Sequence, residues 1–367
     1  MGLKCGIVGL PNVGKSTLFN ALTETMNAEA SNYPFCTIEP NLGTVIINDP
    51  RVDELVKIYN PKKIVPSTID FVDIAGLVKG ASKGEGLGNQ FLSHIREVEA
   101  IVHIVRCFDD DNIIHVDGNV DPKRDIEIIE TELILKDLDT VEKRLEKVSK
   151  SSRTGDKKLK TEVELFERLK EHFATGRLAK YFYDEQSDEE KAILNELQLI
   201  TNKPVLYVAN VSDTEVNGNK YTEIVKEIAS IEDAKFLILS AKIESEISML
   251  ASHEEKQEFL STIGLEESGL DRLVHESYKL LGLITFFTAS DREVHSWTIP
   301  SGLRAPQAAG KIHTDFEKGF IRAEIIKYKD FIVYESEQAI KEKGLLFVEG
   351  KEYIVEDGDI VYFRFNV

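Results

Sequence analysis

Short apolar runs alternate with polar and glycine-rich connections in the first third of the chain, and two more such runs follow much later. The runs are Lys4–Val8, Gly43–Ile47, Ser67–Ile74, Ala100–Cys107, Pro204–Asn210 and Lys235–Ser240. Continuous apolar runs of this length are typical of strands buried on both faces, as in parallel sheets. Segments long enough for a helix separate most of them. We therefore expect an α/β domain with a mainly parallel sheet whose strands are split by an insertion.

The insertion, residues 125–200, has a helical period instead. Its apolar residues recur mostly at intervals of three and four on both sides of a polar break at 151–156; they are Ile126, Ile129, Leu133, Leu138, Val141, Leu145, Val148, Leu159, Val163, Phe166, Leu169 and Phe173. Two such stretches around a break predict an antiparallel helical coiled coil that projects from the sheet domain.

After residue 281 the pattern changes to five short strands with few helices. The expected strands are Leu283–Thr288, Val294–Ile299, Gly319–Ile326, Leu345–Val348 and Asp359–Phe365, and one helical stretch covers Ser336–Lys343. This mixture favours a small α+β module. The predicted organisation is a sheet domain at 1–124 and 201–280, a helical hairpin at 125–200 and a C-terminal module at 281–367.

Charge is distributed unevenly. The chain has 45 Lys and Arg against 64 Asp and Glu, a formal charge of -19, which argues against non-specific binding to polyanions over the whole surface. The hairpin turn is the exception, with basic residues at Lys143, Arg144, Lys147, Lys150, Arg153, Lys157, Lys158 and Lys160. We call these eight residues the basic tip. Two interpretations stay open: a solvated helix end, or a finger that touches RNA phosphates.

Neither the cysteines nor the apolar runs indicate secretion or a membrane. Cys5, Cys36 and Cys107 are an odd number without metal-ligand spacing, so we expect reduced thiols. Gly9 and Pro11 interrupt the N-terminal apolar run before a signal sequence forms, and no stretch is long enough to span a bilayer. We expect a cytoplasmic protein.

The strongest chemical signal is the sequence from Gly9 to Ser16, which fits G-x-x-x-x-G-K-[ST] directly after a predicted strand. Its glycines let consecutive backbone N–H groups point at phosphates, and the following helix adds its partial positive charge. Lys15 would bridge the β- and γ-phosphates, and the Ser16 hydroxyl would bind Mg²⁺. The predicted nucleotide contacts of this loop are Asn12, Val13, Gly14, Lys15, Ser16 and Thr17.

Further elements favour a hydrolase over a small-molecule kinase. Asp73 and Gly76 fit D-x-x-G at the end of a strand, where the carboxylate holds a Mg²⁺ water and the Gly76 N–H senses the γ-phosphate. Thr37, in the loop between the two motifs, completes the predicted metal set of Ser16, Thr37 and Asp73. The glycine-rich run after Gly76 is costly to order, as a switch segment requires.

Base recognition is predicted after two late strands. Asn210 and Asp213 form Asn-x-x-Asp, and an aspartate can accept two hydrogen bonds from guanine that adenine cannot donate. Val211 stands where a lysine normally covers the base. The sequence Ser240, Ala241 and Lys242 matches the last loop of such sites, which contacts the base through backbone N–H groups.

These elements, in this order, resemble the translation-factor class of P-loop GTPases, and Tyr33–Thr37 with the Gly76–Gly88 run is similar to the Obg-related group. The helical insertion, the segment Ala308–Glu324 and the small C-terminal module identify the chain as a member of the YchF family, the Obg-like ATPases. The resemblance covers essentially the whole chain. It implies a P-loop domain, a coiled-coil insertion, a C-terminal TGS domain of ubiquitin-like β-grasp shape, and association with ribosomes.

The resemblance also implies roles for single residues. The family usually has Glu where this chain has Asp213 and hydrolyses ATP in preference to GTP, so GTP is a real competitor here. Asn12 matches an asparagine that accompanies K⁺-stimulated hydrolysis in related enzymes. Leu77 replaces the water-orienting glutamine of Ras-like enzymes, and His115 matches a histidine suggested to take over that task. A plain turn asparagine and a packing histidine remain the alternatives for Asn12 and His115.

Together these observations predict a cytoplasmic, monomeric, Mg²⁺-dependent ATPase that also accepts GTP, with Lys15, Thr37, Asp73, Gly76 and His115 as catalytic residues. Its expected partner is the ribosome, with rRNA contacts through the basic tip and the TGS domain. The alternatives are a GTP-preferring GTPase and a ribosome- or RNA-binding protein for which nucleotide is mainly a conformational ligand.

Overall fold

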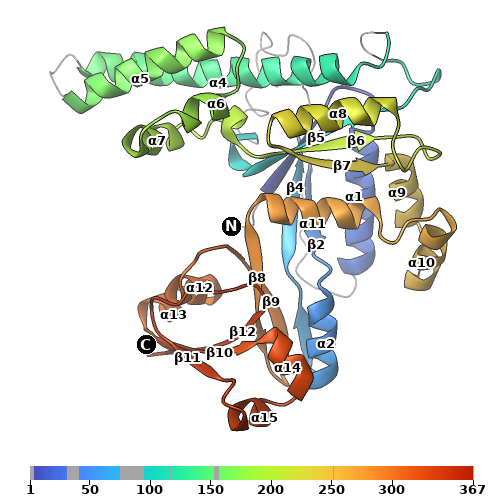
Figure 1. Ribbon diagram of the computed structural model, residues 1–367, viewed down its shortest axis with the longest axis vertical. Coiled ribbons are helices and arrows are strands. Elements are labelled where there is room, and N and C mark those ends of the chain that lie inside the picture. The colour runs from blue at the N-terminus through green and yellow to red at the C-terminus, as the bar shows by residue number, and fades with distance from the viewer. Residues whose placement is uncertain are drawn as a thin grey trace.

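The computed structural model describes residues 4–30, 41–74, 95–115, 118–152, 157–250 and 252–366. These residues form two six-stranded sheets, with the helical insertion at the opposite end of the molecule from the second sheet (Figure 1).

The first sheet has the order β2-β4-β1-β5-β6-β7. Its strands are β1 (Lys4–Val8), β2 (Leu42–Ile46), β4 (Thr68–Asp73), β5 (Ala100–Arg106), β6 (Val205–Asn210) and β7 (Lys235–Leu239). All neighbours pair in parallel except β2, which is antiparallel to β4. The expected parallel-rich sheet is thus present. The apolar runs are continuous because helices cover both faces and leave the central strand β5 buried throughout.

Five helices accompany this sheet in the described part of the chain. They are α1 (Lys15–Ala30), α8 (Lys220–Ile231), α9 (Ala241–Ser248), α10 (His253–Thr262) and α11 (Gly269–Leu280). Leu18 and Leu22 of α1 and Leu273 of α11 are buried in one core with the strands. Cys5 and Cys107 are buried and form no disulfide.

The insertion starts with α4 (Pro122–Ser152), a long helix with two different partners. Ile129 and Leu133, in its first half, belong to the core of the first sheet. Val141 and Val148, in its second half, pack with α5 (Lys157–Ala174), which returns beside it (Figure 1). The helical period of the sequence is therefore real, but its first part anchors the insertion to the sheet. Three short helices follow: α6 (Ala179–Asp184), α7 (Asp188–Asn195) and the 3₁₀ turn η2 (Ile200–Asn202).

The second sheet has the order β11-β10-β12-β8-β9-β3. Its strands are β3 (Lys63–Val65), β8 (Leu283–Ala289), β9 (Glu293–Pro300), β10 (Phe320–Lys327), β11 (Phe347–Glu349) and β12 (Asp359–Phe365). Four helices of the C-terminal segment accompany it: α12 (Ala305–Ile312), α13 (Thr314–Lys318), α14 (Tyr328–Tyr334) and α15 (Glu337–Glu342). The sequence indicated only the last of these helices, because the other three are short and lack an extended apolar period.

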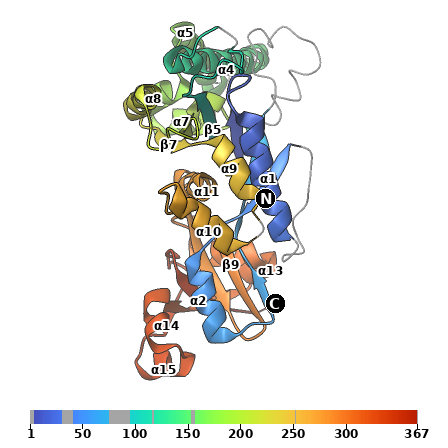
Figure 2. The same cartoon turned by 90° about the vertical axis from the view of Figure 1, so that its right-hand side faces the viewer.

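One segment lies elsewhere than expected. We predicted that residues 50–65 belong to the first sheet domain, but β3 is a strand of the second sheet. Helix α2 (Pro50–Tyr59) lies beside the elements of that sheet (Figure 2). Leu55 of α2 is buried against Phe287 and Ile360, and β3 pairs in parallel with β9. Apolar periodicity shows that a segment is buried but not which sheet buries it.

Candidate functional site

The carboxyl ends of the parallel strands of the first sheet meet at one edge, where ligands bind in open α/β sheets. The register pairs Ile7 of β1 with Asp73 of β4, and Arg106 of β5 with Asn210 of β6. The loop after β1 and the loop that begins at Ser240 leave from the same edge. Parallel pairing therefore gathers side chains that lie far apart in the sequence.

The loop from Gly9 to Gly14 connects β1 directly to α1. Its backbone conformation and close neighbours restrict which residues can stand at several of its positions. Gly14 has φ +93°, and a Cβ there would overlap the side-chain amide of Asn210. A Cβ on Gly9 would lie 2.6 Å from the carbonyl oxygen of Ile104. Asn12 has φ +62°, a left-handed conformation that asparagine tolerates. The two glycines of the motif are thus required because other groups approach them too closely to leave room for a side chain.

Lys15 and Asp73 lie together at this edge. The Lys15 ammonium forms an ion pair with the Asp73 carboxylate, and the two side chains are only 14% and 13% exposed. Ser16 and Thr17, at the first turn of α1, are exposed. The structure therefore brings together a cation for phosphates, a carboxylate and two accessible hydroxyl groups.

Asn210 joins the phosphate loop to the later loop. Its Nδ2 donates to the Val13 carbonyl at 2.8 Å, and its Oδ1 accepts from the Ala241 N–H at 2.9 Å. Asn210 is 3% exposed and Val211 is 2% exposed. Asn210 is therefore a brace between the loops. The side chain of Val211 packs in the core, which differs from the expected nucleotide contact.

The base-reading end carries an exposed ion pair. The Lys242 ammonium pairs with the Asp213 carboxylate, and this hydrogen bond holds the pKa of Asp213 below its usual range and raises the pKa of Lys242. Ser240, the N-cap of α9, is buried, and its hydroxyl has no hydrogen-bond partner among the described residues. A carboxylate, an ammonium and a buried hydroxyl therefore surround the place predicted for the base.

The backbone next to His115 lies against the phosphate loop, and the ring contacts the insertion. The Asn12 side-chain nitrogen donates to the carbonyl of Ile114 at 3.1 Å, which holds the preceding residue against the loop. The His115 Nε2 lies 2.9 Å from Oδ2 of Asp125, near the start of α4, and both side chains are buried. Arg124 donates to the other oxygen of Asp125. Nε2 thus faces the insertion.

Part of the predicted site falls outside the described residues, namely Thr37, Gly76 and Leu77. Of the predicted metal donors, the structure describes Ser16 and Asp73. A hydroxyl and a carboxylate suit Mg²⁺, which keeps several waters and takes its other ligands from phosphates. Over the residues that the structure describes, no group of three or more His, Cys, Asp or Glu could hold a metal ion by itself. This donor set therefore fits a cation that arrives with a nucleotide.

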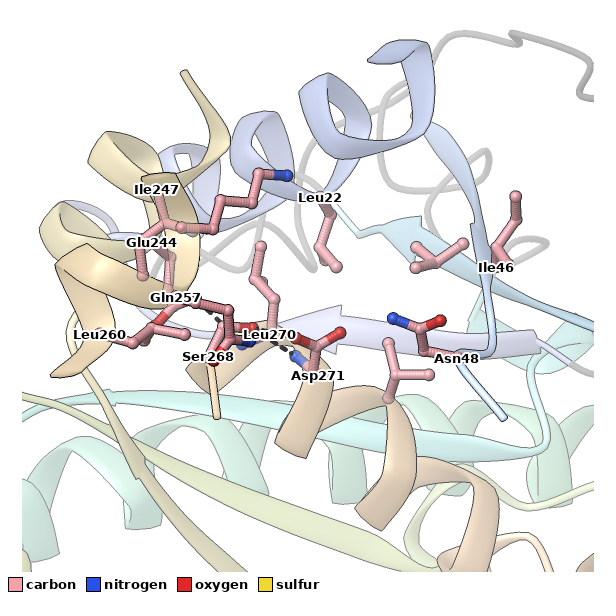
Figure 3. Close-up of a pocket in the computed structure, with 13 residues that line it drawn as sticks. Leu22, Ile46, Asn48, Glu244, Ile247, Gln257, Leu260, Ser268, Leu270 and Asp271 are labelled. Carbon is pink, nitrogen blue, oxygen red and sulfur yellow. Dashed lines mark hydrogen bonds between the residues drawn. The ribbon is translucent and has the colours of Figure 1, made fainter. Parts of the chain in front are cut away.

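A cavity of about 110 Å³ lies between α1, β2 and helices α9 to α11 (Figure 3). Its wall includes Leu22, Ile46 and Glu244. Both carboxylate oxygens of Glu244 accept backbone N–H groups, from Gly269 at 2.8 Å and Leu270 at 3.1 Å, while burial raises its pKa to about 7. None of the predicted site residues lines this cavity, and the hydrogen bonds of Glu244 give it a structural role at the start of α11.

Sequence reasoning missed two side chains near the site, Arg106 and Asp125, and it did not foresee that Asn210 would brace Val13 and Ala241. Arg106 had a visible signal, because it is a charged residue near the end of the otherwise apolar run Ala100–Cys107. Asp125 had none, since one acidic residue at the start of a charged helix is unremarkable.

No helix in the described part of the chain is long and apolar enough to cross a membrane.

Comparison with known proteins gives two family matches. Residues 4–151 match a family described as 50S ribosome-binding GTPase, and residues 283–366 match the C-terminal YchF-GTPase family, described as a protein of unknown function. Proteins called ribosome-binding ATPase YchF are similar over the full length of both chains, with 54% identity in Bacillus subtilis and 52% in Haemophilus influenzae.

Two solved structures are also similar. The YchF GTPase of Schizosaccharomyces pombe is 42% identical with a TM-score of 0.87, and the match covers 99% of this chain and 98% of that one. A GTP-binding protein of Pyrococcus horikoshii has a TM-score of 0.63 at 20% identity, over 99% of this chain and 100% of that one, which shows a shared fold.

Proposed function

The chain belongs to the YchF family, and from this premise we propose that it is a ribosome-associated, Mg²⁺-dependent P-loop ATPase. It hydrolyses ATP to the diphosphate and phosphate and acts as a nucleotide-dependent switch in translation or in a stress response. The main support for this proposal is that two distant side chains contact the phosphate-loop motif. Asp73 forms an ion pair with Lys15, and Asn210 donates a hydrogen bond to Val13.

The roles of the residues follow from their chemistry. Lys15 leaves its ion pair with Asp73 and neutralises the β- and γ-phosphate oxygens as charge builds up on them. Mg²⁺ supplies electrostatic stabilisation of the phosphates, and Ser16, Thr37 and Asp73 would hold it, Asp73 through a water. The Gly76 N–H would sense the γ-phosphate. Ordering of Thr37 and Gly76 would change the surface offered to a partner.

The remaining assignments complete the proposal. His115 orients the attacking water, K⁺ binds beside Asn12, and the base contacts come from Asp213 and the loop Ser240–Lys242. The insertion is a coiled coil, residues 281–367 form a TGS domain, and the protein is a cytoplasmic monomer. The proposed domain boundaries stay at 124, 200 and 280, with residues 50–65 packed on the second sheet.

GTP is the second candidate substrate because the base-reading carboxylate is Asp213 and not the longer glutamate. Against this, Lys242 already engages the carboxylate, and the buried side chain of Val211 cannot cover a base. We therefore expect tighter binding of ATP than of GTP in the presence of Mg²⁺.

Fluorescent ATP and GTP analogues, titrated into the wild type and Asp213→Glu, test the nucleotide assignment. We expect Asp213→Glu to retain ATP binding and to weaken GTP binding about 3- to 10-fold, since a matched hydrogen-bond pair contributes on the order of 1 kcal/mol. Lys57→Gln, at an exposed position of α2, is the control. Tighter GTP binding by the wild type would show that this chain is a GTPase by preference.

Ribosome association is tested at the basic tip. Two of its lysines are paired within their own helix, Lys143 with Asp139 and Lys150 with Glu146. Lys158 and Lys160, at the start of α5, are exposed. Reversing Lys158 and Lys160 to Glu should weaken cosedimentation with ribosomes at least 10-fold and flatten its salt dependence.

Reversal of the exposed Lys226 on α8, remote from the tip, is the matched control. Unchanged cosedimentation of the tip variant would assign ribosome contact to another surface. Single-turnover hydrolysis with and without ribosomes then separates an effector-stimulated enzyme from a protein that uses nucleotide mainly as a conformational ligand. An enzyme of the first kind accelerates on the ribosome.

A further inference from the structure

Arg106, at the carboxyl end of β5, is a buried arginine whose described hydrogen bonds all go to backbone carbonyls. It is 2% exposed, and its Nε donates to Phe108 at 3.1 Å. Its Nη1 donates to Ile113 at 2.9 Å and its Nη2 to Asp110 at 3.3 Å. The guanidinium carbon also lies 4.6 Å from the centre of the Phe108 ring. One planar fork thus holds three points along the following loop.

The loop gains a defined shape from these bonds. The Asp110 carboxylate accepts from the backbone N–H of Asn112 at 2.8 Å, which closes a turn inside the span that Arg106 bridges. Near the start of the loop, Tyr221 of α8 donates to Asp109, and Asn219, which precedes α8, donates to the carbonyl of Cys107 at 2.7 Å. Arg106 is therefore the anchor in the middle of the loop, and α8 anchors its beginning.

The end of the loop contacts the phosphate loop through a hydrogen bond. The Ile114 carbonyl, next to the last residue that Arg106 holds, accepts the Asn12 side-chain nitrogen at 3.1 Å. Because the acceptor is a carbonyl, the Asn12 amide must present its NH₂ group there, and its own oxygen is left on the opposite side. The position of Ile114 therefore decides which way the Asn12 amide faces.

We infer that Arg106 is a positioning residue of the nucleotide site, which acts by setting the Ile114 carbonyl that orients the Asn12 amide. Arg106 needs no contact with nucleotide for this role. The inference rests on the proposed function and deepens it, because it names the residue that holds one polar group of the phosphate loop in a single orientation. Misplacement of such a group slows turnover more than it weakens binding.

The test is Arg106→Lys, which keeps the positive charge but cannot reach three carbonyls with a planar fork. We expect kcat for ATP to fall about 10-fold, while the Kd for a fluorescent ATP analogue changes less than about 2-fold. Arg272→Lys is the matched control, since Arg272 of α11 also donates to a backbone carbonyl, that of Ile238 in β7 at 3.0 Å. It should alter the melting temperature without altering kcat.

A second variant keeps the test decisive if Arg106→Lys folds poorly. Asn12→Gly removes the amide while glycine retains the positive φ of this position. It should reproduce the loss in kcat, and the double variant should be no slower than the slower single variant. Additive effects of the two substitutions would overturn the inference.

An NMR measurement reads out the orientation without any turnover. The side-chain amide signals of Asn12, assigned by their loss in Asn12→Gly, should move toward free-amide positions in Arg106→Lys and stay unchanged in Arg272→Lys. Unmoved signals in Arg106→Lys would also overturn the inference. A wild type that binds ATP but does not hydrolyse it would contradict the proposed function instead, while the NMR result would still decide the role of Arg106.

Discussion

Asn210 shows how one side chain can join two parts of a site. Its amide uses both ends, one on the phosphate loop at Val13 and one on the base-reading loop at Ala241. The same amide lies so close to Gly14 that no side chain fits there. An asparagine is required because it offers a donor and an acceptor on one short side chain.

Replacing Asn210 by Ala should weaken ATP binding about 10- to 100-fold, since both loops lose a buried hydrogen bond and Val13 and Ala241 keep unpaired backbone groups. The measurement is a fluorescence titration with an ATP analogue. Thr201→Val serves as the control, because Thr201 is also buried and hydrogen-bonded, to Asp137, but lies in η2. A lower melting temperature with unchanged affinity for Asn210→Ala would contradict the bracing role.

At the scale of elements, α4 contacts the first sheet through a partly buried pair of carboxyl groups. The Tyr207 hydroxyl on β6 lies 2.9 Å from Glu130 of α4 and 3.0 Å from Glu232 at the end of α8. Lys180 of α6 pairs with Glu232. The tyrosine hydroxyl has a single proton, so it cannot donate hydrogen bonds to two ionised carboxylates at once. Burial and the neighbouring Glu232 raise the pKa of Glu130 to about 8.

The sign of the resulting pH effect follows from proton counting. At pH values between the usual pKa of a glutamate and about 8, Glu130 keeps its proton in the folded protein and loses it in the unfolded chain. The free energy of unfolding therefore falls as the pH rises through this range. Glu130→Gln has no carboxyl group at this position and does not lose stability in this way. The melting temperature of the variant minus that of the wild type should therefore increase by about 2–5 °C between pH 5 and pH 8.5.

Differential scanning calorimetry at the two pH values measures this change, with Glu127→Gln, an exposed residue on the same helix, as the control. A difference between Glu130→Gln and wild type that does not change with pH would show that Glu130 is ionised in the folded protein.

At the scale of the whole molecule, the segment between β2 and β4 ties the two sheets together. β2 and β4 pair in the first sheet, while α2 and β3 between them belong to the second. Arg51 of α2 holds Asp49 at 2.8 Å and Asp357 at 2.6 Å, and it lies over the Phe287 ring. A movement of β2 would therefore be transmitted to the second sheet through α2 and β3.

Arg51→Gln should loosen this joint, because it leaves two carboxylates without their cation and costs about 1–3 kcal/mol. Hydrogen exchange should become faster in α2 and β3 and stay unchanged in β1 and β5. Lys57→Gln, which removes an exposed ion pair with Glu54 on the same helix, should change neither. Equal acceleration in both sheets would show that α2 contributes to overall stability and is not a local joint.

Much of this architecture follows from local pattern. The continuous apolar runs of β1, β5 and β6 predict a parallel sheet, since only strands covered on both faces are apolar at every position. The phosphate loop is equally local, because its two glycines, Lys15 and Ser16 act within eight consecutive residues. Helix α4 is also visible from its period, although the period does not say that its first half is buried against the sheet.

The sequence by itself thus determined the α/β class, the phosphate loop and the helical insertion, because these depend on neighbours a few residues apart. Only the tertiary structure decided that β3 joins the second sheet, that Nε2 of His115 faces Asp125, and that the Ile114 carbonyl meets the Asn12 side chain. The first and the last of these depend on a pairing between distant segments. Such a pairing is chosen by the register and packing of the whole sheet, and no local pattern records it.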